Sequence, residues 1–192
     1  MGKVVVSEFI SLDGVIEDPG GAEGTDFGGW TFQFPAEDGM GFKMQELIDA
    51  DVQLLGRVTY EEFAEAWPGM KETTGDFGVK MNAMPKVVVS TTLADPAWEN
   101  STVDDGSDLP GLVARLKEQY DGDVLVAGSA TLVEALRQHD LVDEYRLMVH
   151  PIVLGRGKKL FRDGSDATTL SVAETRMVGP DVQLVIYRPV GR

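Results

Sequence analysis

The chain contains the stretch Val52-Gln-Leu-Leu-Gly56-Arg57-Val58-Thr59-Tyr60-Glu61-Glu62, and the same layout returns at Val124-Leu-Val-Ala-Gly128-Ser129-Ala130-Thr131-Leu132-Val133-Glu134. Each copy is an apolar run followed by G-x-x-T-x-x-E, which predicts a short strand, a glycine turn and a helix. A threonine followed three residues later by a glutamate is typical of a capping box. We therefore expect Thr59 and Thr131 to cap the two helices.

Two such turns predict a site for a ligand that carries two phosphates. Gly56 and Gly128 allow a sharp turn, or a close approach of the backbone to a ligand. The first amides of each following helix, with the positive end of its dipole, suit an anion such as a phosphate. One strand–glycine–helix joint is also a common packing device, but two at matched positions suggest a dinucleotide. Neither glycine belongs to a G-x-G-x-x-G fingerprint, which disfavours a Rossmann fold.

The composition is that of a globular, acidic protein: 192 residues, 43% hydrophobic, without cysteine, with a formal net charge of −15. This length predicts a single domain over residues 1–192. The charge argues against nucleic acid and anionic membranes as partners, and no apolar run approaches the roughly 20 residues that span a bilayer. The lack of cysteine excludes disulfides and thiolate chemistry. With an N-terminus that has no signal-peptide pattern, it favours a cytoplasmic location.

Strand and helix patterns alternate over two thirds of the chain, and strand patterns alone follow. Strands are expected at 4–10, 52–55, 85–93, near Val103, at 124–127 and 144–153, and in a hairpin of 170–178 with 182–189. Helices are expected at 42–50, at 60–66, from an Asp108 cap to residue 120, and at 132–139. Alternation implies right-handed parallel crossovers. We therefore expect an α/β fold of three layers (αβα), with a mixed, mainly parallel central sheet and an antiparallel C-terminal hairpin.

Two segments fit this pattern less clearly. Residues 71–83 are polar and ambiguous. Trp30, Phe32 and Phe34 alternate, which is typical of a short extended piece or of an aromatic lid.

Five motifs in this order resemble the dihydrofolate reductase-like superfamily. The closer resemblance is to a branch similar to the reductase domain of the bifunctional riboflavin-biosynthesis deaminase/reductase. The motifs are S-L-D-G from Ser11, G-R-x-T-Y-E from Gly56, P-K-x-V-x-S from Pro85, A-G-S from Ala127 and P-x-V-L-G-x-G-x-x-L-F from Pro151. The resemblance covers nearly the whole chain and implies that fold, a nicotinamide cofactor and a homodimer that pairs through the late strands.

The resemblance also implies a set of site residues. For the cofactor they are Ile16, Gly56, Arg57, Val58, Thr59, Ser90, Thr91, Gly128, Ser129, Ala130, Thr131 and Leu132. For the substrate they are Asp13, Gly14, Trp30, Gly155 and Gly157, with Asp13 or a water molecule as the proton donor. Two positions depart from the family. Met40 stands where dihydrofolate reductases place the pterin-binding carboxylate, which argues against true folate reduction. Ala130 replaces an arginine, so a cation for a 2′-phosphate must come from elsewhere, with Arg57 and Lys86 as candidates.

Several of these residues also have a purely structural interpretation. Arg57 can form a surface ion pair with Glu61, and Asp13 can bond its own turn. Trp30 can belong to the core, Ser90 and Thr91 can simply end a strand, and Gly155 and Gly157 can form a plain turn. The two histidines, His139 and His150, are too scattered for a metal site, and none is expected.

We therefore expect a reductase that transfers a hydride from NADPH, with NADH not excluded, to a small pterin- or pyrimidine-like heterocycle. Hydride transfer requires little of the protein beyond positioning and exclusion of water, which suits a sequence without an obvious nucleophile. Two alternatives stay open. One is 5-amino-6-(5-phosphoribosylamino)uracil reductase activity in riboflavin biosynthesis, and the other is nucleotide binding without catalysis.

Overall fold

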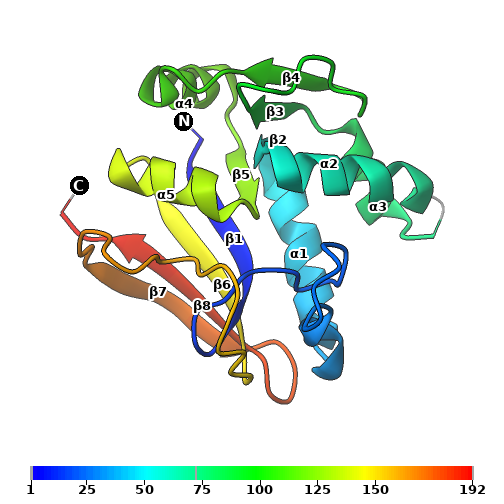
Figure 1. Ribbon diagram of the computed structural model, residues 1–192, viewed down its shortest axis with the longest axis vertical. Helices are drawn as coiled ribbons and strands as arrows, with labels where there is room; N and C mark the ends of the chain where they lie inside the picture. The colour runs from blue at the N-terminus through cyan, green and yellow to red at the C-terminus, as the bar shows by residue number, and fades with distance from the viewer. Residues whose placement is uncertain (1, 72, 192) are drawn as a thin grey trace.

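A sheet of eight strands forms the middle of the molecule (Figure 1). The computed structural model describes residues 2–71 and 73–191. The strands are β1 Val4–Ser11, β2 Ala50–Gly56, β3 Lys86–Val89, β4 Ser101–Asp104, β5 Asp123–Ala127, β6 Glu144–His150, β7 Leu170–Met177 and β8 Gln183–Pro189. The helices are α1 Glu37–Asp49, α2 Arg57–Ala66, α3 Asp76–Ala83, α4 Leu109–Gln119 and α5 Ala130–Gln138, with short 3-10 turns η1 Trp30–Gln33 and η2 Pro68–Met70.

The strands lie in the order β4-β3-β2-β5-β1-β6-β8-β7. The six strands from β4 to β6 in this order are mutually parallel, whereas β8 pairs antiparallel with β6 and β7 pairs antiparallel with β8. The late hairpin therefore forms one edge of the sheet, and β3 and β4 form the opposite edge (Figure 1). The predicted fold class is confirmed.

Helices cover both faces of the sheet, as Figure 1 shows. Side chains of a strand alternate between the faces. Val4 and Val6 pack in the core beneath α4 and α5, whereas Val5 packs in the core beneath α1, α2 and α3. A third cluster joins the hairpin to the start of α1. The apolar runs of the parallel strands are thus buried on both faces, which fixes the three layers.

The helices that follow the glycine turns begin earlier than expected. α2 begins at Arg57 rather than Tyr60, and α5 begins at Ala130 rather than Leu132. In each case the helix starts one or two residues beyond the glycine, so the turn spans fewer residues than a capping box requires. The early starts of α2 and α5 place the first amides of both helices next to the glycine turns.

The two unclear segments are helical. The aromatic segment forms η1, in which Trp30 is 1% exposed and belongs to the core, whereas Phe32 is 80% exposed. The expected extended piece is therefore wrong. The polar segment contains α3, whose Met81 packs beneath the sheet. No helix among the described residues is long and apolar enough to cross a membrane.

Candidate functional site

The carboxyl ends of the parallel strands open into one cleft with a volume of about 890 Å³. Its floor is formed by the ends of β1, β2, β3 and β5, and its walls include the first turns of α2 and α5. The loop of residues 17–23 lies on a further side. Ligands of open α/β sheets bind at this edge, beyond the carboxyl ends of the strands.

The two glycine turns pack directly against each other at the floor of this cleft. A methyl group added to Gly56 would lie 2.0 Å from the Oγ of Ser129. Conversely, a methyl group added to Gly128 would lie 2.9 Å from the Cγ2 and 3.0 Å from the Oγ1 of Thr59. Each glycine is therefore required by a side chain of the other turn, and the two helix N-termini face one shared space.

The first turn leaves its helix amides open. Gly56 has an extended backbone, with φ −80° and ψ 159°, and no side chain caps α2. The first turn of α2 carries no acidic residue and begins with Arg57. Arg57 Nη1 lies 2.7 Å from the Oε2 of Glu61 in an exposed ion pair, so the structural interpretation of Arg57 is confirmed while its side chain also lines the cleft. Uncapped amides beside a guanidinium suit an anion.

The second turn is partly occupied by the protein's own groups. Gly128 has φ 78° and Ser129 has φ 66°, so two successive residues adopt left-handed conformations. The Ser129 hydroxyl accepts a hydrogen bond from the Leu132 amide at 3.4 Å and caps α5. The Gly128 amide donates to the Oε1 of Glu8 at 3.0 Å. An anion that approaches the N-terminus of α5 therefore meets the carboxyl group of Glu8, which already accepts the hydrogen bond of the Gly128 amide.

The predicted threonine caps are wrong, because the helices begin before the threonines. Thr59 lies inside α2, buried against Gly128. Thr131 lies inside α5, and its Oγ1 accepts a hydrogen bond from the Nη2 of Arg162 at 2.9 Å. The glutamates of the two motifs have other partners. Hydrogen bonding to Arg137 is the main cause that lowers the pKa of Glu134 to about 2.

All the residues expected to bind the cofactor line this one cleft. They are Ile16, Gly56, Arg57, Val58, Thr59, Ser90, Thr91, Gly128, Ser129, Ala130, Thr131 and Leu132. Ser90 also ends its strand, since its hydroxyl accepts from the amides of Thr92 and Leu93 at 3.1 and 3.0 Å. Their contact with a cofactor stays a prediction, but the structure brings segments far apart in the sequence to the same surface.

Lys86 does not reach this surface. Its side chain is buried, and its Nζ donates to the backbone carbonyls of Asn82, Met84 and Glu99 at 2.7, 2.8 and 3.1 Å. Burial lowers the pKa of Lys86 to about 8. The expectation that Lys86 serves a 2′-phosphate is therefore wrong, because its charge is fully used inside the fold.

The residues expected around the substrate do not line the cleft. Asp13 instead joins two loops. It accepts hydrogen bonds from the Ser11 hydroxyl at 2.7 Å, the Leu154 amide at 3.1 Å and the Gly155 amide at 2.7 Å. Burial opposes these bonds, but together they lower the pKa of Asp13. Asp13 thus holds the glycine-rich loop, with Gly155, against the first turn, where Gly14 adopts φ 86°. Its geometry argues against a role as proton donor.

Trp30 and Gly157 also have structural roles. The Nε1 of Trp30 donates to the Glu17 carbonyl at 2.9 Å, and its ring packs edge-on against His150 at 5.3 Å. His150 is itself buried, which lowers its pKa, as expected for a packing residue. Gly157 has φ 108°, and a side chain there would approach a methyl group of Val15 at 2.7 Å.

Sequence reasoning missed most of the charged residues that line the cleft, among them Glu8, Lys43, Glu46 and Glu62. Burial raises the pKa of Glu8 to about 8, although the nearby Lys43 opposes the shift. Lys43 donates to the Ser7 hydroxyl and lies 3.1 Å from the Oε2 of Glu46. One signal was present, since Glu8 is the one charged residue of the predominantly apolar strand β1. A charged residue is rarely buried without a partner or a function.

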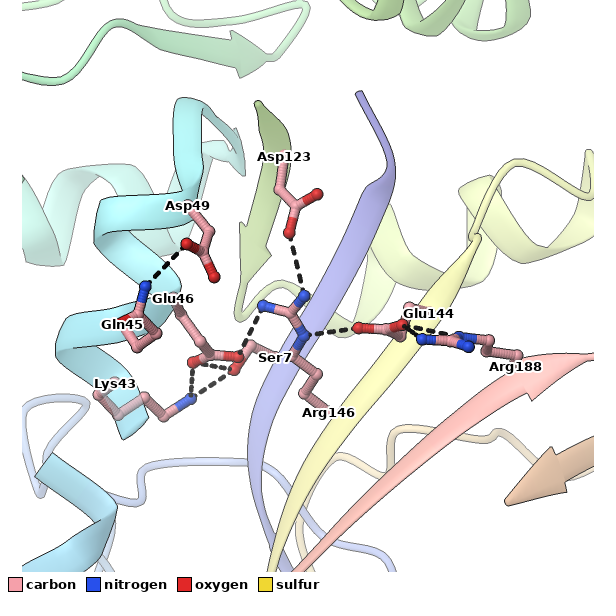
Figure 2. Close-up of polar contacts among 9 residues, drawn as sticks. All are labelled: Ser7, Lys43, Gln45, Glu46, Asp49, Asp123, Glu144, Arg146 and Arg188. Carbon is pink, nitrogen blue, oxygen red and sulfur yellow. Dashed lines mark hydrogen bonds and ion pairs between the residues drawn. The ribbon is translucent and has the colours of Figure 1, made fainter. Parts of the chain in front are cut away.

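A buried charge network runs from this cluster across the sheet (Figure 2). Arg146 of β6 lies at its centre and contacts Glu144 at 2.7 Å, Asp123 at 3.0 Å and Glu46 at 3.7 Å. Glu144 in turn pairs with Arg188 of β8 at 2.8 Å. Figure 2 shows these side chains linking α1, β5, β6 and β8. The network fixes Glu46, and through it Lys43, beside the cleft.

The cleft therefore offers hydrogen-bonding and positioning groups. The chain has no cysteine, and within residues 2–71 and 73–191 no three His, Asp or Glu side chains gather as a group that would hold a metal ion. The arrangement suits the binding and orientation of two ligands in one space.

Comparison with known proteins agrees with the motifs. A family model described as the RibD C-terminal domain matches residues 2–184. The protein YyaP of Bacillus subtilis (strain 168), described as uncharacterized, is 27% identical over 187 residues, which cover 96% of this chain and 94% of YyaP.

Two solved structures are longer proteins that contain this fold. RibD of Acinetobacter baumannii matches with a TM-score of 0.67 and 17% identity, over 99% of this chain and 58% of that one. The diaminohydroxyphosphoribosylaminopyrimidine deaminase/5-amino-6-(5-phosphoribosylamino)uracil reductase of Thermotoga maritima matches with a TM-score of 0.61 and 19% identity, over 98% of this chain and 56% of that one. At these identities the likeness shows a shared fold, which is dihydrofolate reductase-like.

Proposed function

The chain belongs to the RibD C-terminal domain family, and on this premise we propose that it is a reductase that uses NADPH to reduce a small heterocycle. The family suggests an oxidoreductase. The observation that most supports this proposal is the packing of the two glycine turns against each other, with Gly56 against Ser129 and Gly128 against Thr59. It supports one continuous site for a ligand that is long enough to meet both helix N-termini.

Different residues along the cleft would bind different parts of the cofactor. The open amides of α2 and the Arg57 guanidinium would bind phosphate oxygens. Ser90 and Thr91, at the end of β3, would contact the adenosine ribose, and Ile16 would border the nicotinamide. NADPH supplies the hydride, and the walls of the cleft hold the two reactants together and exclude water. Because Asp13 lies outside the cleft lining, a water molecule is the favoured proton donor.

Titration with NADPH and with NADH tests this proposal. Binding is followed by the fluorescence of the three tryptophans and by the rise in melting temperature that a ligand of the folded state causes. Arg57→Ala should weaken NADPH binding by about 1.5–3 kcal/mol, because a charged hydrogen bond is lost. Arg115→Ala is the matched control, since Arg115 forms an exposed ion pair with Asp104 and does not line the cleft. Equal affinities for the two variants would remove Arg57 from the site.

Oxidation of NADPH in the presence of pterins, pyrimidines or quinazolines separates the reductase from a protein that binds nucleotide without catalysis. Binding without oxidation by any of them would favour the second. The family also supports the pyrimidine reductase of riboflavin biosynthesis as an alternative activity.

A cytoplasmic location stays a prediction. Pairing of two copies through the late strands is a further proposal, supported by the exposure of Val172 and Met177 on edge strand β7.

A further inference from the structure

The cleft continues beyond the glycine turns along the later turns of α2. Phe63 of α2, Trp67 directly after α2 and Phe77 of α3 line the cleft there, and we call these three residues the aromatic wall. The rings of Phe63 and Trp67 lie 6.3 Å apart, and those of Trp67 and Phe77 lie 5.4 Å apart. The cleft is also lined by other large apolar side chains, namely Phe9, Phe32, Met40, Leu47, Met70 and Met81. Rings and thioethers of this kind pack against flat aromatic ligands.

Carboxyl groups also line the cleft, and one of them, Glu62, directly precedes Phe63 of the aromatic wall in α2. Glu17, Asp18 and Glu23 line it from the loop of residues 17–23, and Glu62 lines it from α2. The pKa of Glu62 is raised to about 7 by burial and then by the negative charge of Glu23, while the nearby Lys158 opposes the shift. The excess of carboxyl groups over cations therefore makes additional negative charge unfavourable here.

The cations of the described cleft lining are already paired. Lys158 lies 2.6 Å from Glu17 and 3.0 Å from Glu23, and Lys43 lies 3.1 Å from Glu46. Arg57 is the third cation; it lies in the first turn of α2 and pairs with Glu61, one turn further along the same helix. A substrate phosphate beside the aromatic wall would thus find carboxylates that already neutralise the nearby lysines.

Helix α2 itself separates the two kinds of ligand. Its uncapped first turn has the positive end of the helix dipole and carries Arg57, which suits the phosphates of the cofactor. Its later turns carry Glu62 and Phe63 and approach the negative end of the dipole. From the first to the last turn of α2, the wall of the cleft therefore changes from positive and polar to negative and aromatic.

We infer that the substrate is a flat aromatic heterocycle without a phosphate group, which packs on the aromatic wall while the cofactor occupies the N-terminal end of α2. This inference rests on the proposed function and deepens it. It separates this chain from an enzyme for a phosphoribosyl pyrimidine, the substrate class in the name of the Thermotoga maritima protein. The sugar phosphate of such a substrate would meet the carboxyl groups of the loop and of Glu62.

A matched pair of ligands provides the test. NADPH binding is first measured alone. The dissociation constants of 5-amino-6-(5-phosphoribosylamino)uracil, of the same compound without phosphate, and of the bicyclic heterocycle lumazine are then measured with and without NADPH. We expect lumazine to bind, and the compound without phosphate to bind at least about tenfold more tightly than its phosphorylated form. Tighter binding of the phosphorylated form, or no binding of lumazine and the phosphate-free compound, would overturn the inference. Failure of NADPH alone to bind would instead defeat the proposed function, because the ligand comparison is also made without it.

Substitution of Glu62 tests which side chain causes the preference for the phosphate-free compound. At about pH 8.5, above the pKa of Glu62, Glu62→Gln should reduce the preference for the phosphate-free compound at least about threefold. Glu65→Gln removes the same charge from the same helix, but Glu65 is exposed and does not line the cleft, so this control should leave the preference unchanged. An unchanged preference in Glu62→Gln would show that the Glu62 carboxylate is not the charge that disfavours the phosphorylated compound.

Discussion

The two glycine turns share a sequence pattern but not a structure. The first, at Gly56, has an ordinary extended backbone and leads into a helix whose amides no side chain caps. The second, at Gly128 and Ser129, has two residues with positive φ, a serine cap on its helix and a glutamate on its amide. The first glycine is needed only for the close approach of the neighbouring turn, whereas the second is needed for its backbone conformation as well.

This difference suggests unequal roles in anion binding. The first turn presents open amides and Arg57, and the second presents amides that Ser129 and Glu8 already use. Similar G-x-x-T-x-x-E segments therefore do not predict two equivalent phosphate sites. We expect the first turn to dominate the binding of the cofactor phosphates, with the second turn completing the site beside it.

Alanine at each glycine should give the largest effects and should separate the two roles. Gly128→Ala combines a strained positive φ with a clash against Thr59, so it should lower the free energy of unfolding by roughly 3–5 kcal/mol. Gly56→Ala causes a clash with Ser129 alone and should cost roughly 1–3 kcal/mol. Urea denaturation of both variants measures the difference.

Second substitutions serve as controls for the two causes. Ser129→Gly removes the clashing hydroxyl and should restore most of the stability of Gly56→Ala. Thr59→Ala should restore only the clash component of Gly128→Ala, because the backbone strain persists. The coupling in each double-mutant cycle is the informative quantity. Full rescue of Gly128→Ala by Thr59→Ala would show that its positive φ is not costly.

Glu8 should make stability depend on pH, in a way that the first turn does not. The folded protein keeps the Glu8 proton up to about pH 8, whereas the unfolded chain releases it near the ordinary value of 4.5. The unfolded state therefore binds fewer protons between these values, and the free energy of unfolding falls as pH rises through this window. Glu62 acts in the same direction up to about pH 7.

Glu8→Gln removes the contribution of Glu8 and keeps that of Glu62. Between about pH 5 and pH 8.5, the wild-type protein should lose roughly 3–4 kcal/mol more stability than the variant, measured by urea denaturation at each pH. Carboxyl groups with lowered pKa, such as Asp13 and Glu134, titrate below this range. Parallel pH profiles for the two proteins would show that Glu8 is ionised in the folded state at neutral pH.

Much of the fold could be predicted because periodicity and glycine punctuation are local signals. The apolar runs at Val4 and Val124 and the Asp108 cap all led to the observed elements. The starts of α2 and α5 were misplaced, because the threonine of each G-x-x-T-x-x-E segment lies inside its helix rather than at the cap. The packing of Gly56 on Ser129 and of Gly128 on Thr59 joins segments far apart in the sequence, so no local pattern contains it.

The site was predicted unevenly for a related reason. The residues expected around the cofactor share one cleft because they lie at strand ends and helix starts, which topology brings together. The residues expected around the substrate lie on loops, and their side chains turn toward other loops, as Asp13 does toward Gly155. Lys43 and Glu46 were missed because the single sequence offers no local pattern that separates a helix face lining a cleft from one facing solvent.

The smallest effect should come from the helix caps, and it decides between the two descriptions of the second turn. Ser129→Ala removes the hydroxyl that accepts from Leu132 and should cost about 0.5–1 kcal/mol. Thr131→Ala removes only a hydrogen bond from the exposed Arg162 and should cost less than about 0.5 kcal/mol. Urea denaturation of both variants under the same conditions compares them. The reverse ranking would mean that Thr131 caps α5 after all, and that the helix begins where its sequence pattern, rather than the packing of the two turns, places it.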